Sequence, residues 1–177
     1  MNFSILSPLS TFAGVARLAG ATVTTVCLLL ASGMAQAQTQ AIAVKGQTAQ
    51  IQARGLDDKP FDMARLKNKV VMVFYWSTSC GVCLSHMPEL RANLVGWRGK
   101  PFELVTVNVD ASMADWRAYE QISAKLESVR PITLWAGKTA TPRLPLTLVL
   151  NTKGQVIARH EGRIAPEAWD DVAEALP

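Results

Sequence analysis

The chain has 177 residues, of which 49% are apolar, 18% charged and 7% aromatic. This composition excludes a disordered chain, a collagen-like repeat and a disulfide-dense scaffold, because apolar residues are plentiful and only three cysteines are present. The formal net charge is +4, but the basic residues form no long run, so we expect no nucleic-acid partner.

Residues 1–37 have the pattern of a secretory signal peptide. They contain one basic residue, Arg17, and no acidic residue, followed by an apolar stretch at 18–35 and by the tripeptide AQA at 35–37. A positive charge, an apolar core and small residues at positions −3 and −1 predict cleavage after residue 37. The alternative is an uncleaved membrane anchor, because the stretch at 18–35 is near the lower length limit for spanning a bilayer.

The first half of the remaining chain predicts two buried strands around a helix. Residues 38–47 are small and polar and are expected to form a flexible lead-in before a domain at 48–177. Residues 48–53 alternate apolar and polar side chains, as a half-buried or edge strand does. The apolar runs at 70–76 and 102–109 predict strands buried on both faces, and residues 80–94 between them have helical spacing.

The second half predicts a helix, a hairpin and a final helix. Residues 113–129 have helical spacing that places Trp116, Tyr119, Ile122 and Leu126 on one face. Residues 132–135 fit either a short strand or a loop. The segments that follow are two strands joined by the turn NTKG, at 146–150 and 155–160, and a C-terminal helix at 166–176. The sequence therefore predicts an α/β fold with a central mixed sheet flanked by helices.

Cys80 and Cys83 form a Cys-x-x-Cys pair, which is typical either of a zinc site or of a redox dithiol. A structural zinc site needs four ligands, and His86 could bring the local number to three at most. Haem attachment requires a histidine directly after the second cysteine, and that position is Leu84. A static bridge across two residues would constrain the unfolded chain very little. The pair is therefore interpreted as a redox-active disulfide, and we expect neither a metal nor a separate cofactor.

The place of the pair in the predicted fold assigns different roles to its two sulfurs. Cys80 falls where the strand at 70–76 gives way to a helix, and the helix N-terminus stabilises a thiolate there. We expect Cys80 to be the nucleophile and Cys83, one turn later and more enclosed, to be the resolving thiol. Gly81 and Val82 lie between them and are expected to help set the reduction potential.

The segment VFYWSTSCGVCLSHMPEL resembles the active-site segment of the thioredoxin superfamily, and among its branches the TlpA/ResA type of exported thiol-disulfide oxidoreductase. The matching features are Trp76 four residues before the first cysteine, Thr78, the cysteine pair and Pro88. The resemblance covers about residues 48–176 and implies a thioredoxin-like fold with an N-terminal extension hairpin. Trp76 would support the active site, either from the core beneath it or as a substrate contact.

The resemblance also implies that Pro145 is the family's cis-proline, with Leu144 directly before it. A cis bond there would let the backbone of Leu144 pair with an extended substrate chain beside the disulfide. Ser79 replaces the tryptophan that usually precedes the first cysteine, which should open the rim of the disulfide.

Two further departures concern the interior of the predicted fold. Phe74 stands where thioredoxins have a buried acid, and Thr106 stands where they have its lysine partner. Proton removal from Cys83 would then need water or another group. His86 is expected to be an exposed helix residue, with a role in tuning Cys80 as the alternative, and Asp110 is expected to be a solvated strand end.

These features predict a periplasmic thiol-disulfide oxidoreductase of a Gram-negative bacterium that reduces disulfides in partner proteins. The resemblance implies that a membrane electron-transfer protein of the DsbD/CcdA type returns electrons to the pair. Cytochrome c biogenesis is one role in this branch, but Gly81 and Val82 lack the acidic residue that relatives devoted to it often have nearby. The alternatives are a DsbA-like disulfide donor and a copper-binding accessory protein with Cys80 and Cys83 as soft ligands.

Overall fold

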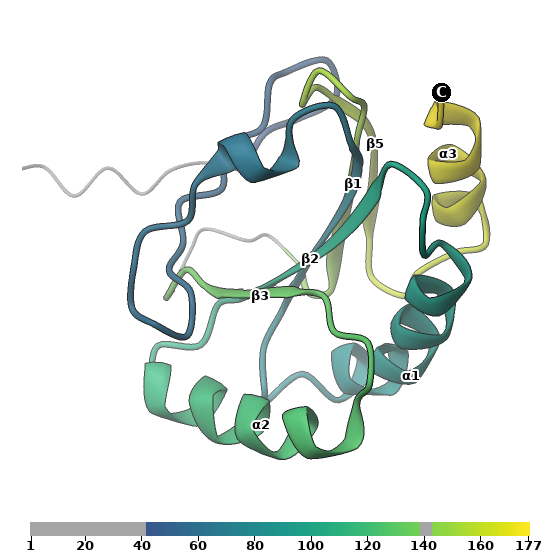
Figure 1. The fold of residues 1–177 in the computed structure, drawn as a ribbon. Helices are drawn as coiled ribbons and strands as arrows, with labels where there is room; N and C mark the ends of the chain where they lie inside the picture. Colours follow the sequence, from purple (N-terminus) through teal and green to yellow (C-terminus); the bar gives the residue numbers. More distant parts are fainter. Residues whose placement is uncertain (1–41, 139–142) are drawn as a thin grey trace, which may run out of the picture. The chain divides into compact units, whose positions relative to one another are not determined.

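The computed structural model describes residues 42–138 and 143–177 (Figure 1). The expected signal peptide and the first residues of the expected lead-in lie outside these ranges, so the prediction of cleavage after residue 37 stays a prediction. The described chain is built around a five-stranded sheet with the order β3-β2-β1-β4-β5.

Strand β1 (Val70–Trp76) lies at the centre of the sheet, and all of its residues are buried. It pairs in parallel with β2 (Phe102–Asn108) and antiparallel with β4 (Leu146–Leu150). The predicted central strands and the mixed sheet are thus confirmed.

The two edges of the sheet are short strands. β3 (Ile132–Trp135) runs parallel to β2, so the segment that fitted either a strand or a loop is a strand. β5 (Val156–Glu161) pairs antiparallel with β4 across the turn NTKG, which confirms the predicted hairpin.

Three helices pack on one face of this sheet, as Figure 1 shows. They are α1 (Gly81–Gly96), α2 (Met113–Leu126) and α3 (Glu167–Ala175). All three contribute buried side chains to the same apolar cluster as Phe74 and Trp76 of β1. This arrangement places the N-terminus of α1 directly after the end of β1, where the cysteine pair lies.

The opposite face of the sheet is covered by extended chain and by a short 3-10 helix, η1 (Met63–Leu66). Ala49, Ile51 and Ala53 are buried against this face, which confirms the predicted alternation. The prediction of a regular strand at 48–53 is wrong, because its only bridge joins Thr48 to Gln155 and the next bridges are formed by Arg54, after the segment.

The expected N-terminal hairpin is reduced to a single bridged turn. A single bridge between Arg54 and Pro60 closes the turn between them. Arg54 also exchanges two backbone hydrogen bonds, each 2.9 Å long, with Trp135 at the end of β3.

Only part of the apolar face predicted for α2 contacts the core: Trp116 is buried and Tyr119 packs against the same cluster. Ile122 is 62% exposed and Leu126 is 77% exposed, whereas Glu120 and Ser123 are buried with Trp116. The helix also ends at Leu126, before the expected boundary.

Side chains from outside the helix explain the burial of Glu120. Arg130 Nη2 lies 2.5 Å from one carboxylate oxygen of Glu120, and the Thr133 hydroxyl donates to the other at 2.7 Å. Burial raises the pKa of Glu120, although Thr133 and Arg130 act to lower it. Polar partners on β3 and on the segment before it thus explain why Glu120 of α2 is buried.

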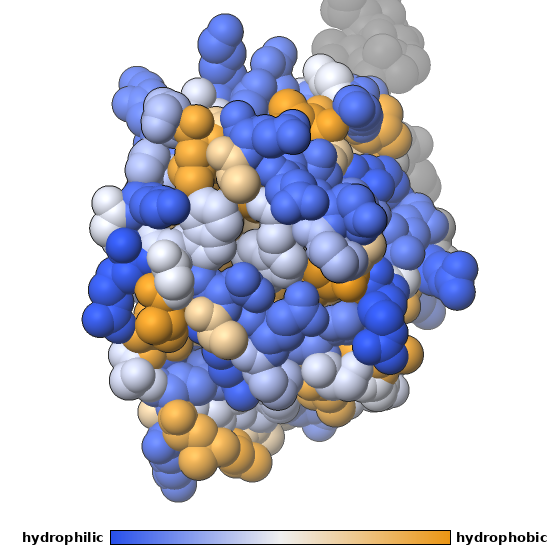
Figure 2. Space-filling view, turned by 90° about the vertical axis from the view of Figure 1, so that its right-hand side faces the viewer, coloured by the Kyte–Doolittle hydropathy of each residue, from blue (hydrophilic) through white to orange (hydrophobic). Residues whose placement is uncertain are grey.

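The side of the molecule that carries α1 and α3 is mostly polar, with apolar residues in small separate patches (Figure 2). Within the described ranges, none of the helices is long and apolar enough to span a membrane.

Candidate active site

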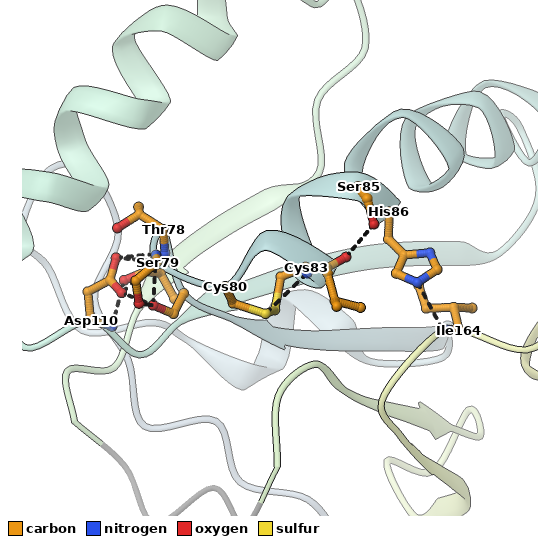
Figure 3. Close-up of a disulfide and its surroundings, with 11 residues drawn as sticks. Thr78, Ser79, Cys80, Cys83, Ser85, His86, Asp110 and Ile164 are labelled. Atoms are coloured by element: carbon orange, nitrogen blue, oxygen red, sulfur yellow. Dashed lines mark hydrogen bonds between the residues drawn. A yellow bond between two sulfur atoms is a disulfide. The ribbon is translucent and has the colours of Figure 1, made fainter.

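Cys80 and Cys83 form a disulfide at the N-terminus of α1, with their Cα atoms 5.2 Å apart. Cys80 is the N-cap residue, and its Sγ accepts a hydrogen bond of 3.1 Å from the backbone N–H of Cys83. Cys80 is partly exposed, whereas Cys83 is completely buried. Cys80 can therefore meet a partner at the surface, whereas Cys83 is enclosed. Figure 3 shows the disulfide between them at the start of α1.

The turn before Cys80 is ordered by the carboxylate of Asp110, which follows the end of β2 (Figure 3). The Ser77 hydroxyl and the backbone N–H of Thr78 both donate to this carboxylate. The side-chain amide of Asn108 donates to it as well, at 2.9 Å. Asp110 is thus held by the turn rather than solvated, and the prediction of a solvated strand end is wrong.

These hydrogen bonds keep Asp110 ionised. Partial burial acts to raise its pKa, but the hydrogen bonds from Ser77, Asn108 and Thr78 outweigh burial and hold the pKa below its ordinary value. A carboxylate without a proton can only accept hydrogen bonds.

The ionised state of Asp110 fixes the direction of the next hydrogen bond in the turn. Because the Ser77 hydroxyl donates its proton to Asp110, the 2.8 Å contact between the Ser77 and Ser79 hydroxyls must use the proton of Ser79. The backbone N–H of Ser79 donates to the same Ser77 oxygen at 3.1 Å. The turn that leads into Cys80 is therefore held by a directed chain of hydrogen bonds that ends on Asp110.

The structure places the other predicted site residues on two sides of the disulfide. Ser79, Gly81 and Val82 are exposed, and Val82 is 44% exposed, so this side of the disulfide is open to a partner. Trp76 is completely buried and packs against Tyr119 with a ring-centroid distance of 4.7 Å. Of the two roles considered for Trp76, the structure supports packing in the core beneath the turn.

Leu144 and Pro145 come to the same end of the sheet from a distant part of the sequence. The peptide bond between them is cis, as the resemblance implies. The register of β4 against β1 pairs Leu146 with Tyr75, so the preceding two residues lie beside the chain that leads from β1 into the turn before Cys80. Pro145 is buried and Leu144 is half-buried.

His86 departs from its predicted exposure. It is only 3% exposed, and both of its ring nitrogens have partners. The sequence does not predict the burial of His86, because one of its partners, Ile164, lies on the distant segment between β5 and α3. The other partner, Glu89, lies on α1, and no local sequence pattern links His86 to Ile164. The only signal in the sequence was the helical spacing that places residue 86 in line with Leu90 and Leu94.

Among the residues that the structure describes, no group of three or more histidine, cysteine or acidic side chains is arranged to hold a metal ion. What the arrangement offers chemically is one partly exposed and one buried sulfur at a helix N-terminus, with backbone N–H groups available to stabilise a thiolate.

Comparisons with known proteins agree with this geometry. Residues 38–167 match the AhpC/TSA family, and no curated protein sequence matches the chain. The thioredoxin domain of a thiol-disulfide oxidoreductase from Bacteroides vulgatus superposes with a TM-score of 0.60 at 16% identity, over 76% of this chain and 99% of that one.

Two further solved structures show the same fold. A thioredoxin-family thiol:disulfide interchange protein from Chlorobium tepidum has a TM-score of 0.56 and 22% identity, over 76% of this chain and 99% of that one. An exposed lipoprotein thioredoxin from Streptococcus pneumoniae has a TM-score of 0.55 and 17% identity, over 71% and 99% of the two chains.

Proposed function

We propose that the chain, which belongs to the AhpC/TSA family, is a thiol-disulfide oxidoreductase of the TlpA/ResA type. In this proposal it reduces disulfides of partner proteins in the periplasm of a Gram-negative bacterium. The observation that carries this proposal is the pairing of a partly exposed Cys80 at a helix N-terminus with a fully buried Cys83. Such an arrangement lets a single sulfur meet the partner.

In the proposed reaction, the Cys80 thiolate attacks one sulfur of the partner's disulfide and displaces the other as a thiolate. Cys83, as a thiolate, then attacks Cys80 Sγ, which closes the Cys80–Cys83 disulfide and releases the partner's second thiol. Two electrons pass to the partner, and each released thiolate takes up a proton. The N-terminus of α1 and the N–H of Cys83, 3.1 Å from Cys80 Sγ in the disulfide, favour the Cys80 thiolate in the reduced protein.

The second step uses a proton acceptor other than a buried acid beneath the pair. Phe74 is completely buried and pairs with Thr106 in the register of β1 and β2. Neither side chain has a carboxylate. We propose that water at the partly exposed Cys80 end of the disulfide takes the proton of Cys83, in the absence of a carboxylate at position 74. Gly81, Val82 and Ser79 would form the open rim, while Leu144 and Pro145 would hold the partner's chain on the other side.

The proposed location and direction rest on the sequence. The pattern of residues 1–37 supports export, and the third cysteine of the chain, Cys27, lies within that segment. One of the similar structures, from Streptococcus pneumoniae, is described as an exposed lipoprotein thioredoxin. A reductant in an oxidising compartment needs a continuous supply of electrons, and we propose a membrane dithiol donor of the DsbD/CcdA type for this role.

The reduction potential of the Cys80–Cys83 pair tests the direction of the reaction. The purified protein is equilibrated in redox buffers and the free thiols are trapped, with Cys83→Ser as the control that cannot close the disulfide. A value near −270 mV, about that of thioredoxin, is expected for a reductant. A value near −120 mV, about that of the strong oxidant DsbA, would replace this proposal with disulfide donation.

A trapping experiment tests the role of each sulfur. Reduced Cys83→Ser should accumulate a mixed disulfide through Cys80 when it meets a peptide disulfide, whereas reduced Cys80→Ser should accumulate far less, because Cys83 is buried. Equal trapping by the two variants would contradict the assignment of Cys80 as the nucleophile.

A further inference from the structure

His86 lies on α1 one turn after Cys83, and its hydrogen bonds define which nitrogen carries the proton. The backbone N–H of Ile164 lies 3.3 Å from Nε2, and a carboxylate oxygen of Glu89 lies 3.2 Å from Nδ1. An amide N–H can only donate, so Nε2 is the acceptor and the ring proton resides on Nδ1, which donates to Glu89. The other Glu89 oxygen accepts a bond of 3.1 Å from the indole N–H of Trp169 on α3.

The Nε2 atom of His86 binds the segment at 162–164. The same segment also contacts Pro145, on the side of the disulfide where we expect a partner chain to bind. Residues 162–164 connect β5 to α3, and the N–H of Gly162 donates to the carbonyl of Pro145 at 2.7 Å. The segment is thus fastened at Gly162 to Pro145 and at Ile164 to His86. Ile164 is buried, so its N–H has no ready access to water if His86 is lost.

These contacts argue against a role for His86 as a base toward Cys83. Nε2 is occupied by the Ile164 N–H, and Nδ1 is directed at Glu89. Neither nitrogen is free to take a proton from the thiol while the segment 162–164 stays in place.

We propose that His86 is a positioning residue that ties the Leu144–Pro145 segment to the helix carrying the disulfide, through residues 162–164. The inference rests on the proposed function, because it assigns His86 a part in holding the surface on which a partner chain docks. Loss of His86 should therefore weaken the binding of a peptide disulfide. It should leave the intrinsic reactivity of Cys80 unchanged.

A matched pair of substitutions separates the two ring nitrogens. His86→Gln is long enough to place an amide oxygen near the position of Nε2 and can still accept from Ile164. His86→Asn is one methylene shorter, keeps a polar group near Glu89 and cannot reach Ile164. Trp169→Phe is the control, since it removes the indole bond to Glu89 but leaves the Ile164 contact intact.

Each variant is assayed at a temperature at which it is fully folded, with a peptide disulfide and with the small reagent 5,5′-dithiobis(2-nitrobenzoate). For His86→Asn we expect KM for the peptide to rise roughly tenfold, as for the loss of one buried hydrogen bond. Its kcat and the rate with the small reagent should stay within about twofold of the unsubstituted protein. His86→Gln and Trp169→Phe should stay within about threefold in every assay.

Equal losses with the peptide and the small reagent would overturn the proposal, because they would place the effect of His86 on Cys80 itself. Equal behaviour of the Asn and Gln variants would overturn it as well. In the unsubstituted protein, nitrogen NMR should show the Nδ1–H tautomer of His86 and a slowly exchanging Ile164 amide, and an Nε2–H tautomer would refute the contact. This measurement needs no variant, so it decides the contact even if the protein reduces no peptide, a result that would instead count against the proposed function.

Discussion

Replacement of Asp110 by asparagine should destabilise the turn that presents Cys80. The carboxylate accepts hydrogen bonds from Ser77, from the Thr78 N–H and from Asn108. An asparagine side chain keeps one oxygen, and its NH₂ group would face donors that have lost their acceptor. A hydrogen bond to a charged group contributes about 1.5–3 kcal/mol, so Asp110→Asn should lower the free energy of unfolding by about 2–3 kcal/mol at pH 7.

The size of this effect should depend on pH in a defined direction. The pKa of Asp110 in the folded protein lies below its ordinary value of 3.8, so its contribution is present above that value. The contribution is lost as the pH falls through the lower folded-state pKa. The difference between the unsubstituted protein and Asp110→Asn should therefore be constant from pH 7 to about pH 4 and shrink below it.

Urea unfolding of the oxidised protein over a series from pH 7 to pH 2 measures this difference. Asp115→Asn is the control, because Asp115 is an exposed aspartate on α2 and its replacement changes the net charge by the same amount. The reasoning is refuted if the two variants are equally stable at pH 7, or if the cost of Asp110→Asn stays the same in acid.

Two more predictions concern groups buried away from the disulfide. Burial raises the pKa of Tyr75 to about 12 against an opposing effect of Arg159. Between about pH 10 and about pH 12 the unfolded chain therefore ionises first, and the free energy of unfolding should fall. This loss is about 3 kcal/mol, and urea unfolding in alkali should show it for the unsubstituted protein but not for Tyr75→Phe; equal losses would count against it. Arg130→Met should cost about 3 kcal/mol in urea unfolding, because it leaves the Glu120 carboxylate buried without its cation. The double variant Glu120→Leu/Arg130→Met should recover most of that loss, and no recovery would show that the two charges are not coupled.

The parts of the fold that the sequence predicts well are those whose signal lies within one segment. The apolar run of β1 and the placement of Cys80 at a helix start need no knowledge of distant residues. The residues whose exposure the sequence predicts wrongly share a different property. Each is held by hydrogen-bond partners that lie far away in the sequence.

Two examples make the physical reason concrete. Asp110 is separated from Thr78 by 32 residues, and His86 is separated from Ile164 by 78 residues. A polar side chain followed by a turn is solvated in most proteins. Asp110 gains its hydrogen-bond donors only when β1 packs beside β2, and His86 gains its donor only when the segment before α3 packs beside α1. Periodicity records burial of apolar groups and carries no information about such polar pairs.

The face of the sheet opposite the helices is covered in part by chain that precedes the first helix. A chain that started at Asp62 would retain every helix and strand of the structure, from η1 to α3. It would nevertheless lose Ala49, Ile51 and Ala53, which belong to the same buried cluster as Val73 and Val107. β-Branched side chains that lose their cover on a sheet face promote self-association. The structural domain therefore begins well before its first regular element, and a truncation guided by secondary structure alone should yield an aggregating protein.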